Sequence, residues 1–469
     1  MKKLVWLAVV AAGFLLILNA QNAKKPDIAT EVDKSRGRKV SKIAIPDFKG
    51  SGEAQAFMTT FNQTLWADVS GSGVVDVVPK TMYPLSVPQQ PSDFVQPPPP
   101  PADNPRARTP VIPPPTSGGG RWLSDWSSPP VSANYLAAGY TAPQNGVLVL
   151  YGWVFDLSRG TAADAQVVGN RYLGSLDEAG ARKVAHEFAG DIVKIFGGQS
   201  LFGTHIYFTS YRGGHHEIWV MDPDGKNQRQ FTHYNSDSIE PAVSPDGSKI
   251  AFTSYAHFYP GIFVFSVDPV REFGFYNQNV SVNSSPSFSP DGKQIIYSSS
   301  AGKCCRIFIA NLDGTGFRAI SSLISIDTEP KINPKTGSEI VFTSGRSGPQ
   351  QVYKMNMDGA DVERLSEGTG EAGNATWHPD GQIIAFAWTK GLAEQAWNIF
   401  TMPVASRKFV QLTHGEGKNE QPTWAPDGVH LAFASTRHGR YQIYSMLADG
   451  THVEQLTTVG TNDRPFWGK

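Results

Sequence analysis

A tetrapeptide built on Pro-Asp-Gly returns along this chain at an almost fixed distance. Four complete copies and one degenerate copy, Asn-Pro-Lys-Thr-Gly, place their prolines at positions 245, 290, 334, 379 and 426, so the spacing is 44 to 47 residues. A constant period of this length is the signature of a repeat architecture, in which each repeat is one supersecondary unit. The carboxylates of these tetrapeptides are expected to cap their own turns, because Asp closes a turn and Gly accepts a positive φ.

Each period contains the same series of short apolar segments. An apolar strand follows the Pro-Asp-Gly turn, a second strand ends in an Asp-Gly turn, and a third short strand ends in Phe/Leu-Thr/Ser. A Pro-x-aromatic strand completes the unit, and four strands in about 45 residues are typical of a propeller blade. The first repeat, near His205, lacks this last strand, and the chain ends on Pro465-Phe466-Trp467. The sequence therefore predicts an all-β six-bladed β-propeller closed by the C-terminal strand.

The residues before the propeller divide into segments of different composition. Residues 1–23 carry two lysines and an apolar run that predict a signal peptide for export, with an uncleaved anchor as the alternative. Residues 24–38 are charged and predict a mobile tail. Residues 39–200 predict a small α+β N-terminal domain, and residues 201–469 the propeller. A proline-dominated insertion at 84–120 is expected to be a polyproline or disordered surface loop, or else a docking ligand for a partner.

The N-terminal domain shows two amphipathic helices and several strands. One helix is expected over residues 53–68, and a final helix begins at a capping-box pair, Ser175 and Glu178. Strands are expected at 42–48, 74–78, 135–140, 147–157 and 165–173. The pattern indicates a mixed sheet with both helices on one face.

The sequence contains none of the catalytic motifs that would indicate an enzyme. It has no Gly-x-Ser-x-Gly nucleophile elbow, no His-Glu-x-x-His zinc motif and no phosphate-binding glycine loop ending in Lys-Ser/Thr. His215, His216 and Glu217 are adjacent and are a weak candidate for a metal site. The two cysteines, Cys304 and Cys305, are interpreted as a buried pair, with a strained vicinal disulfide as the alternative. A formal charge of −1 leaves no basic footprint for nucleic acid. No cofactor is expected, although a weakly bound cation in the propeller channel is left open.

The loops that enter the innermost strands form one mouth of the predicted propeller. Alignment of the six Pro-x-aromatic strands brings one residue of each blade to an equivalent place at this mouth, with a second residue just before it. We predict that this ring binds a partner, because binding sites concentrate in loops carried by a rigid scaffold. The candidate residues are Glu240, Ser284, Ser285, Thr328, Glu329, Asn374, Glu420, Gln421, Asp463 and Arg464.

The combination of these features resembles the TolB family, the soluble periplasmic components of the Tol-Pal envelope system. The matching segments are Ile43–Phe48 (Ile-Ala-Ile-Pro-Asp-Phe), 135–140, 202–207 and the terminal Pro465-Phe466-Trp467. The resemblance implies a monomeric, non-enzymatic periplasmic protein that maintains the outer membrane and its constriction during cell division. It also implies a Pal-like lipoprotein partner at the mouth, where Thr328 and Glu329 match the family motif and Ser284 and Ser285 depart from it.

The same resemblance assigns a role to the N-terminal tail. It implies that a TolA-like inner-membrane protein binds the tail, and other outer-membrane proteins are further candidate partners. The tail residues that carry this expectation are Glu31, Val32, Asp33 and Arg36. Two alternatives stay open: an exported propeller that binds carbohydrate or peptide outside the Tol system, and an oligosaccharide-processing propeller enzyme with a metal among its histidines.

Overall fold

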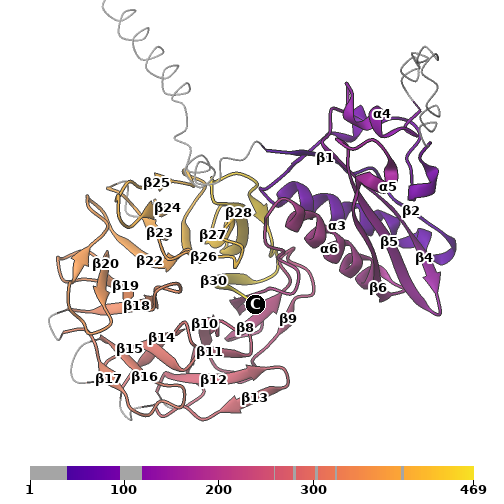
Figure 1. Cartoon of the computed structure of the whole chain (residues 1–469). Coiled ribbons are helices and arrows are strands. Elements are labelled where there is room, and N and C mark those ends of the chain that lie inside the picture. Colours follow the sequence, from indigo (N-terminus) through magenta and orange to yellow (C-terminus); the bar gives the residue numbers. More distant parts are fainter. Residues whose placement is uncertain are drawn as a thin grey trace, which may run out of the picture. The chain divides into compact units, whose positions relative to one another are not determined.

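Six four-stranded antiparallel sheets follow one another along the chain and close into a ring (Figure 1). The blades are β30 (Thr461–Gly468), β7 (His205–Tyr211), β8 (His216–Met221) and β9 (Arg229–Gln230); β10 (Ser238–Val243), β11 (Lys249–Ser254), β12 (Gly261–Val267) and β13 (Val270–Phe273); β14 (Asn283–Phe288), β15 (Gln294–Ser299), β16 (Arg306–Asn311) and β17 (Arg318–Ala319); β18 (Asp327–Ile332), β19 (Glu339–Ser344), β20 (Gln351–Asn356) and β21 (Glu363–Arg364); β22 (Ala372–Trp377), β23 (Ile383–Trp388), β24 (Asn398–Pro403) and β25 (Val410–Gln411); β26 (Asn419–Trp424), β27 (His430–Ser435), β28 (Gln442–Leu447) and β29 (Glu454–Gln455).

This computed structural model describes residues 40–95, 119–257, 259–277, 281–301, 305–322, 325–391 and 396–469. The C-terminal strand β30 pairs with β7, so the last residues of the chain complete the first blade. This confirms the predicted six-bladed propeller and its mode of closure. Closure leaves no unpaired inner edge between the two ends of the ring. No helix among the described residues is long and apolar enough to cross a membrane.

The propeller core consists of apolar residues of the blade strands, which are buried between neighbouring blades. In five of the six blades the second strand follows the Pro-Asp-Gly-type turn, and β7 is the exception. These strands are buried almost throughout, as in β11, where Ile250, Ala251 and Phe252 are fully buried. The turn glycines adopt the left-handed conformation, with φ of +74° at Gly247 and +69° at Gly292. A side chain at these positions would be strained, which explains why glycine recurs there.

The N-terminal part is a mixed sheet with helices, as the sequence predicts. The sheet order is β3-β1-β4-β5-β6, with β1 parallel to β3 and β4, and with β2 pairing β4. Its elements are β1 (Lys42–Ala44), β2 (Lys49–Gly50), η1 (Gly52–Phe57), α3 (Met58–Gly71), β3 (Asp76–Val77), η2 (Lys80–Met82), η3 (Pro91–Asp93), α4 (Leu123–Ser127), β4 (Tyr135–Gln144), β5 (Val147–Asp156), α5 (Ala162–Ala165), β6 (Gln166–Ser175) and α6 (Glu178–Ile195).

Helices α3 and α6 lie side by side and bury their apolar residues in one core (Figure 1). Phe61 and Leu65 of α3 and Phe188 of α6 are fully buried there. Gly152 of β5 makes room for this packing, because a Cβ at that position would lie 2.9 Å from the Phe188 ring.

Three details of the N-terminal part differ from the sequence-based expectation. In the insertion expected to be a polyproline or disordered surface loop, the described residues 84–95 contain η3 and bury Phe94 in a hydrophobic core, and residues 96–118 lie outside the described residues. The first turn of the helix expected at 53–68 is the 3-10 helix η1, and the α-helix begins only at Met58. The cap of α6 is Asp177, whose carboxylate accepts the Gly180 N–H at 2.7 Å, and the predicted cap Ser175 donates to Asp177 instead. Ser175 ends strand β6, which places it too early to cap the helix.

Candidate functional site: the mouth of the propeller

The six innermost strands share a β-bulge close to the point where each one begins. In every blade the register shifts over the same three-residue step, for example between Ile239 and Ala242 in β10. A non-glycine residue with positive φ sits inside each bulge. These residues are Glu240 (φ +59°), Ser285 (+55°), Glu329 (+55°), Asn374 (+54°), Gln421 (+55°) and Arg464 (+48°).

The six bulge residues are the same six that the sequence places in a ring. A left-handed conformation costs a non-glycine residue roughly 1–2 kcal/mol, so its recurrence in all six blades marks a constrained feature. Proline follows the bulge residue in five blades, and proline cannot donate a hydrogen bond to the strand ladder. Bulges are typical of places where a strand re-aims a side chain.

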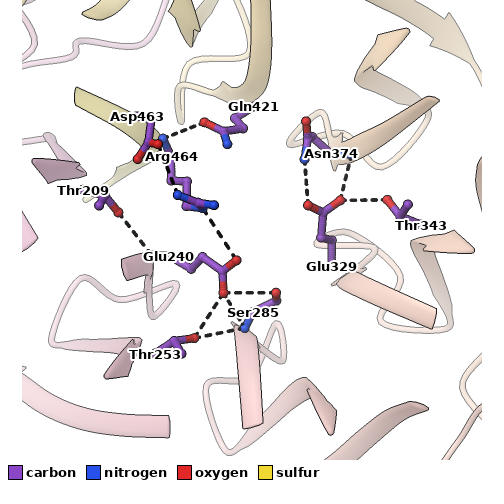
Figure 2. Close-up of polar contacts among 10 residues, drawn as sticks. All are labelled: Thr209, Glu240, Thr253, Ser285, Glu329, Thr343, Asn374, Gln421, Asp463 and Arg464. Atoms are coloured by element: carbon purple, nitrogen blue, oxygen red, sulfur yellow. Dashed lines mark hydrogen bonds and ion pairs between the residues drawn. The ribbon is translucent and has the colours of Figure 1, made fainter. Parts of the chain in front are cut away.

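At four of the six junctions between neighbouring blades, the backbone N–H of a bulge residue donates a hydrogen bond to a side chain of the preceding blade; this count covers the described residues. The Glu240 backbone N–H donates to Thr209 Oγ1 at 3.2 Å, and the Arg464 N–H donates to Gln421 Oε1 at 2.8 Å. The other two junctions of this kind use carboxylates as acceptors (Figure 2). The mouth is therefore a polar ring whose members hold one another in place.

Glu240 is the centre of the first carboxylate cluster. Its Oε2 accepts the backbone N–H of Ser285 at 2.8 Å and the hydroxyls of Ser285 and Thr253, each at 3.1 Å. Its Oε1 lies 3.6 Å from Arg464 Nε, and Arg464 also pairs with Asp463 at 3.1 Å. This cluster joins three consecutive blades (Figure 2).

Glu329 is the centre of the second cluster. Its Oε2 accepts the Asn374 N–H at 2.9 Å and the Thr343 hydroxyl at 2.7 Å. Its Oε1 accepts the Asn374 side-chain amide at 2.7 Å. Both carboxylate oxygens are thus satisfied by the protein, and Figure 2 shows the cluster separate from that of Glu240.

The residues that precede the bulges complete the predicted set. Ser284, Thr328, Glu420 and Asp463 are all half-buried beside the ring. Burial raises the pKa of Glu420, whose carboxylate accepts the Tyr441 hydroxyl, and burial also raises the pKa of Asp463. The Arg464 pKa is raised because the carboxylates of Asp463 and Glu240 outweigh the opposing effect of burial.

One charged residue of this region was not predicted from the sequence. Lys331 lies two residues after Glu329 on β18 and is half-buried, and burial lowers the pKa of its amine. Its Nζ lies 6.0 Å from the centroid of the Phe466 ring on β30. The sequence does contain a signal, because Lys331 is the one charged residue at a position that is uncharged in the other five blades. The equivalent residues are Ala242, Ser287, Thr376, Thr423 and Phe466.

Several other sequence-based candidates have different outcomes. The tail residues Glu31, Val32, Asp33 and Arg36 lie outside the described residues, as does Cys304. His216 and Glu217 are held by separate partners, Asp237 and Thr232. Within the described ranges, no group of three or more His, Cys, Asp or Glu residues is arranged to hold a metal ion.

Known proteins share both the repeats and the wider fold. The chain is 31% identical over 228 residues to a protein TolB homolog of Chlorobium luteolum, which covers 48% of this chain and 50% of that relative. It is 39% identical over 204 residues to the Tol-Pal system protein TolB of Bordetella pertussis, covering 43% and 46% respectively. The chain therefore spans about half the length of the curated relatives that it matches.

A solved structure extends the likeness to nearly the whole chain. The crystal structure of TolB from Acinetobacter baumannii superposes with a TM-score of 0.70, covering 95% of this chain and 98% of that one, at 20% identity. At this identity the match supports the fold alone. The family described as TolB beta propeller domain matches residues 192–393 and 366–468, which is more than half of the sequence. The chain belongs to the TolB β-propeller family.

Proposed function

We propose that this protein is a non-enzymatic, periplasmic interaction module of the Tol-Pal envelope system, and that its propeller mouth binds a Pal-like, peptidoglycan-associated lipoprotein. The observation that carries the proposal is the ring of six left-handed bulge residues. Such a ring holds polar side chains in fixed positions on a rigid scaffold, as recognition of a specific partner requires. The relatives named for the Tol-Pal system support a partner from that system.

The geometry of the mouth favours binding over catalysis. Glu240 and Glu329 have their carboxylate oxygens engaged by neighbouring N–H and hydroxyl groups. A general acid or base needs an oxygen free to exchange a proton with a substrate. Two carboxylates held in this way stabilise a surface of defined shape and charge, which suits recognition of a protein partner.

A binding measurement with the full chain tests the proposed site. Glu329→Arg replaces the carboxylate with a larger, positively charged side chain and removes the three hydrogen bonds that the carboxylate accepts. We therefore expect it to weaken binding of a Pal-like periplasmic domain about 100-fold. Asp313→Arg is the matched control, because Asp313 lies in an exposed Asp-Gly turn of β16–β17, away from the bulges. Isothermal titration calorimetry measures both affinities. Unchanged binding by Glu329→Arg would contradict the mouth as the site.

The tail belongs to the same proposal as a second binding element. We propose that residues 24–38 bind a TolA-like inner-membrane protein by adding an extended segment to the edge of a partner's sheet. A short charged segment with few large apolar residues suits such a docking strand. Deletion of residues 24–38 should abolish TolA-like binding and leave lipoprotein binding intact. Equal binding of the TolA-like domain before and after deletion would remove the tail from the proposal.

The proposed role in the cell follows from the two contacts. A module that engages the lipoprotein and the inner-membrane protein links the two membranes, and we propose that this link maintains outer-membrane integrity and constriction during division. Cells that produce only the Glu329→Arg variant should leak periplasmic enzymes and form chains. Normal growth and septation in such cells would contradict this role.

A further inference from the structure

Lys331 extends into the propeller channel toward the inner strand on the opposite side. The six inner strands follow one another around the ring in the order β30, β10, β14, β18, β22 and β26, so β18 and β30 face each other from opposite sides. The Lys331 Nζ, which starts from β18, nevertheless lies 6.0 Å from the Phe466 ring of β30. The ammonium group is therefore inside the channel. It starts two residues beyond the Glu329 bulge, which is roughly 7 Å further along the strand.

Within the described residues, the Lys331 ammonium makes no hydrogen bond and no ion pair. The acids that act on it electrostatically are Glu240 and Glu329, and neither carboxylate forms an ion pair with it. Glu240 is engaged by Arg464 and by the Ser285 N–H, and Glu329 is engaged by Asn374. Both candidate counter-ions are thus directed toward other partners.

An ammonium group in this position is unfavourable without a counter-ion. A buried charge that is unpaired destabilises the folded state, and here burial lowers the pKa of the amine. Phe466 offers only the weak attraction of an aromatic face to a cation. The three N–H groups of Lys331 remain available to an acceptor that enters from the mouth.

We propose that Lys331 is the binding site for a side-chain carboxylate of the protein partner, an Asp or Glu that enters the channel along its axis. This inference rests on the proposed function, in which the mouth receives a partner. A carboxylate is the acceptor that best matches an unpaired ammonium, and the resulting charge-assisted hydrogen bonds are about twice as strong as neutral ones. Arg464, which is half-buried at the same mouth, adds a second cation along the entry path.

The proposal assigns different roles to two neighbouring residues of β18. Glu329 shapes the rim by holding Asn374, and Lys331 selects the chemistry of the group that passes the rim. The partner would therefore need both a surface that fits the ring and one acidic side chain that projects from it. A neutral or basic side chain at that point would leave the ammonium unpaired and would be rejected.

The first test uses the full chain and the lipoprotein's periplasmic domain. Lys331→Met keeps the length of the side chain and removes its charge, and we expect it to weaken binding about 10-fold or more. Lys335→Met is the matched control, because Lys335 is exposed in the Asn-Pro-Lys-Thr-Gly turn of the same blade. Equal affinity of Lys331→Met and wild type, with Glu329→Arg still impaired, would overturn this inference but keep the proposed function. Absence of binding by wild type would overturn the proposed function itself.

The second test identifies the carboxylate. Each Asp and Glu on the lipoprotein surface is replaced by Ala and measured against wild type and Lys331→Met. One replacement should weaken binding to wild type and have no further effect on Lys331→Met, as expected for a directly interacting pair. If Lys331→Met weakens binding but no acid shows this coupling, the assignment of a carboxylate is wrong.

A stability measurement separates binding from a structural role. Removal of an unpaired charge from this half-buried position should leave the melting temperature of the free protein unchanged or higher. Lys331→Met should therefore bind less well without being less stable. A melting temperature several degrees below wild type would mark Lys331 as a structural residue and would overturn the proposal.

Discussion

The two ends of the propeller both carry repeated carboxylates, but the carboxylates form different kinds of contact. At the end with the Pro-Asp-Gly turns, Asp246 accepts the Ser244 hydroxyl at 2.6 Å and the Ser248 N–H at 3.0 Å, all within one turn. At the mouth, Glu240 and Glu329 accept N–H groups from the next blade, 45 residues further along the chain. The repetition of an acidic residue therefore does not indicate its role. The number of residues between the carboxylate and its hydrogen-bond partner does indicate it.

One Pro-Asp-Gly copy departs from the local pattern. It begins with Ala425, whose methyl side chain cannot form the hydrogen bond that a serine hydroxyl makes in this turn. Its Asp427 carboxylate instead accepts from His430 Nδ1 at 2.6 Å, and His430 Nε2 lies 2.8 Å from the Gly71 carbonyl oxygen at the end of α3. The missing cap thus occurs in a blade that contacts the N-terminal part.

Removal of His430 should produce the largest stability effect at the turn end. His430→Ala leaves the buried Asp427 carboxylate without its partner and the Gly71 carbonyl without a donor. Loss of one member of a buried ion pair destabilises a protein by about 3–5 kcal/mol. Asp291→Ala is the control, because that carboxylate is exposed and bonds only within its own turn. Urea unfolding followed by circular dichroism measures both, and equal effects would contradict the distinction between the two kinds of aspartate.

An intermediate effect is expected from removing a carboxylate at the mouth. Glu329→Ala leaves the Asn374 N–H without its acceptor, which costs about 1–3 kcal/mol when the group is buried. Glu329→Gln keeps an acceptor oxygen and the same backbone constraint, so it should recover most of this loss. The comparison of the two variants by urea unfolding isolates the hydrogen bond from the left-handed conformation. If the Gln variant is as unstable as the Ala variant, the negative charge is what matters.

The sequence predicted the architecture better than the chemistry of the mouth. The Pro-Asp-Gly period determines the number of blades, since turns depend on local residues. The position of β30 follows because the first repeat lacks an innermost strand and the last strand of the chain is left over. The left-handed φ at Glu240 and Glu329 has no local signature, because Glu rarely adopts this conformation. Lys331 was missed for a related reason: its contact with Phe466 crosses the ring and joins residues far apart in the chain. The sequence places the α6 cap at Ser175, two residues before the observed cap Asp177, because strand β6 continues further than its pattern indicates.

A smaller effect should appear in the pH dependence of stability. The His430 pKa is raised, since Asp427 outweighs the opposing effect of burial, and the Asp427 pKa is lowered by the hydrogen bond from His430 against the effect of burial. A raised histidine pKa gives stability that is complete below 6.5 and is lost as pH rises through the folded-state value. A lowered aspartate pKa gives stability that is present above 3.8 and is lost as pH falls. The pair should therefore stabilise most between these two values.

Melting temperatures across the pH range test this window. The difference between wild type and His430→Ala should be greatest between pH 3.8 and 6.5 and should shrink on either side. A difference that stays constant from about pH 3 to about pH 9 would show that His430 acts through packing alone, because this range extends beyond the unperturbed pKa values of both Asp and His.

The smallest effect is expected at an ordinary Pro-Asp-Gly turn. The Asp246 pKa is lowered to about 2, chiefly by the hydrogen bond from the Ser244 hydroxyl and next by the bond from the Ser248 N–H. Ser244→Ala removes the first bond, so the pKa should return toward 3.8 while stability falls by no more than about 1 kcal/mol. NMR titration of the Asp246 side-chain carbon measures this shift, and Asp313, which bonds only to Thr315, is an internal reference whose pKa should not change.

Because Asp246 is exposed and its partners all lie in one turn, Ser244→Ala should leave the mouth and its affinity for a partner unchanged. A change in binding of the proposed lipoprotein partner on Ser244→Ala would mean that the two ends of the blade are coupled through β10, against the separation of local and inter-blade carboxylates.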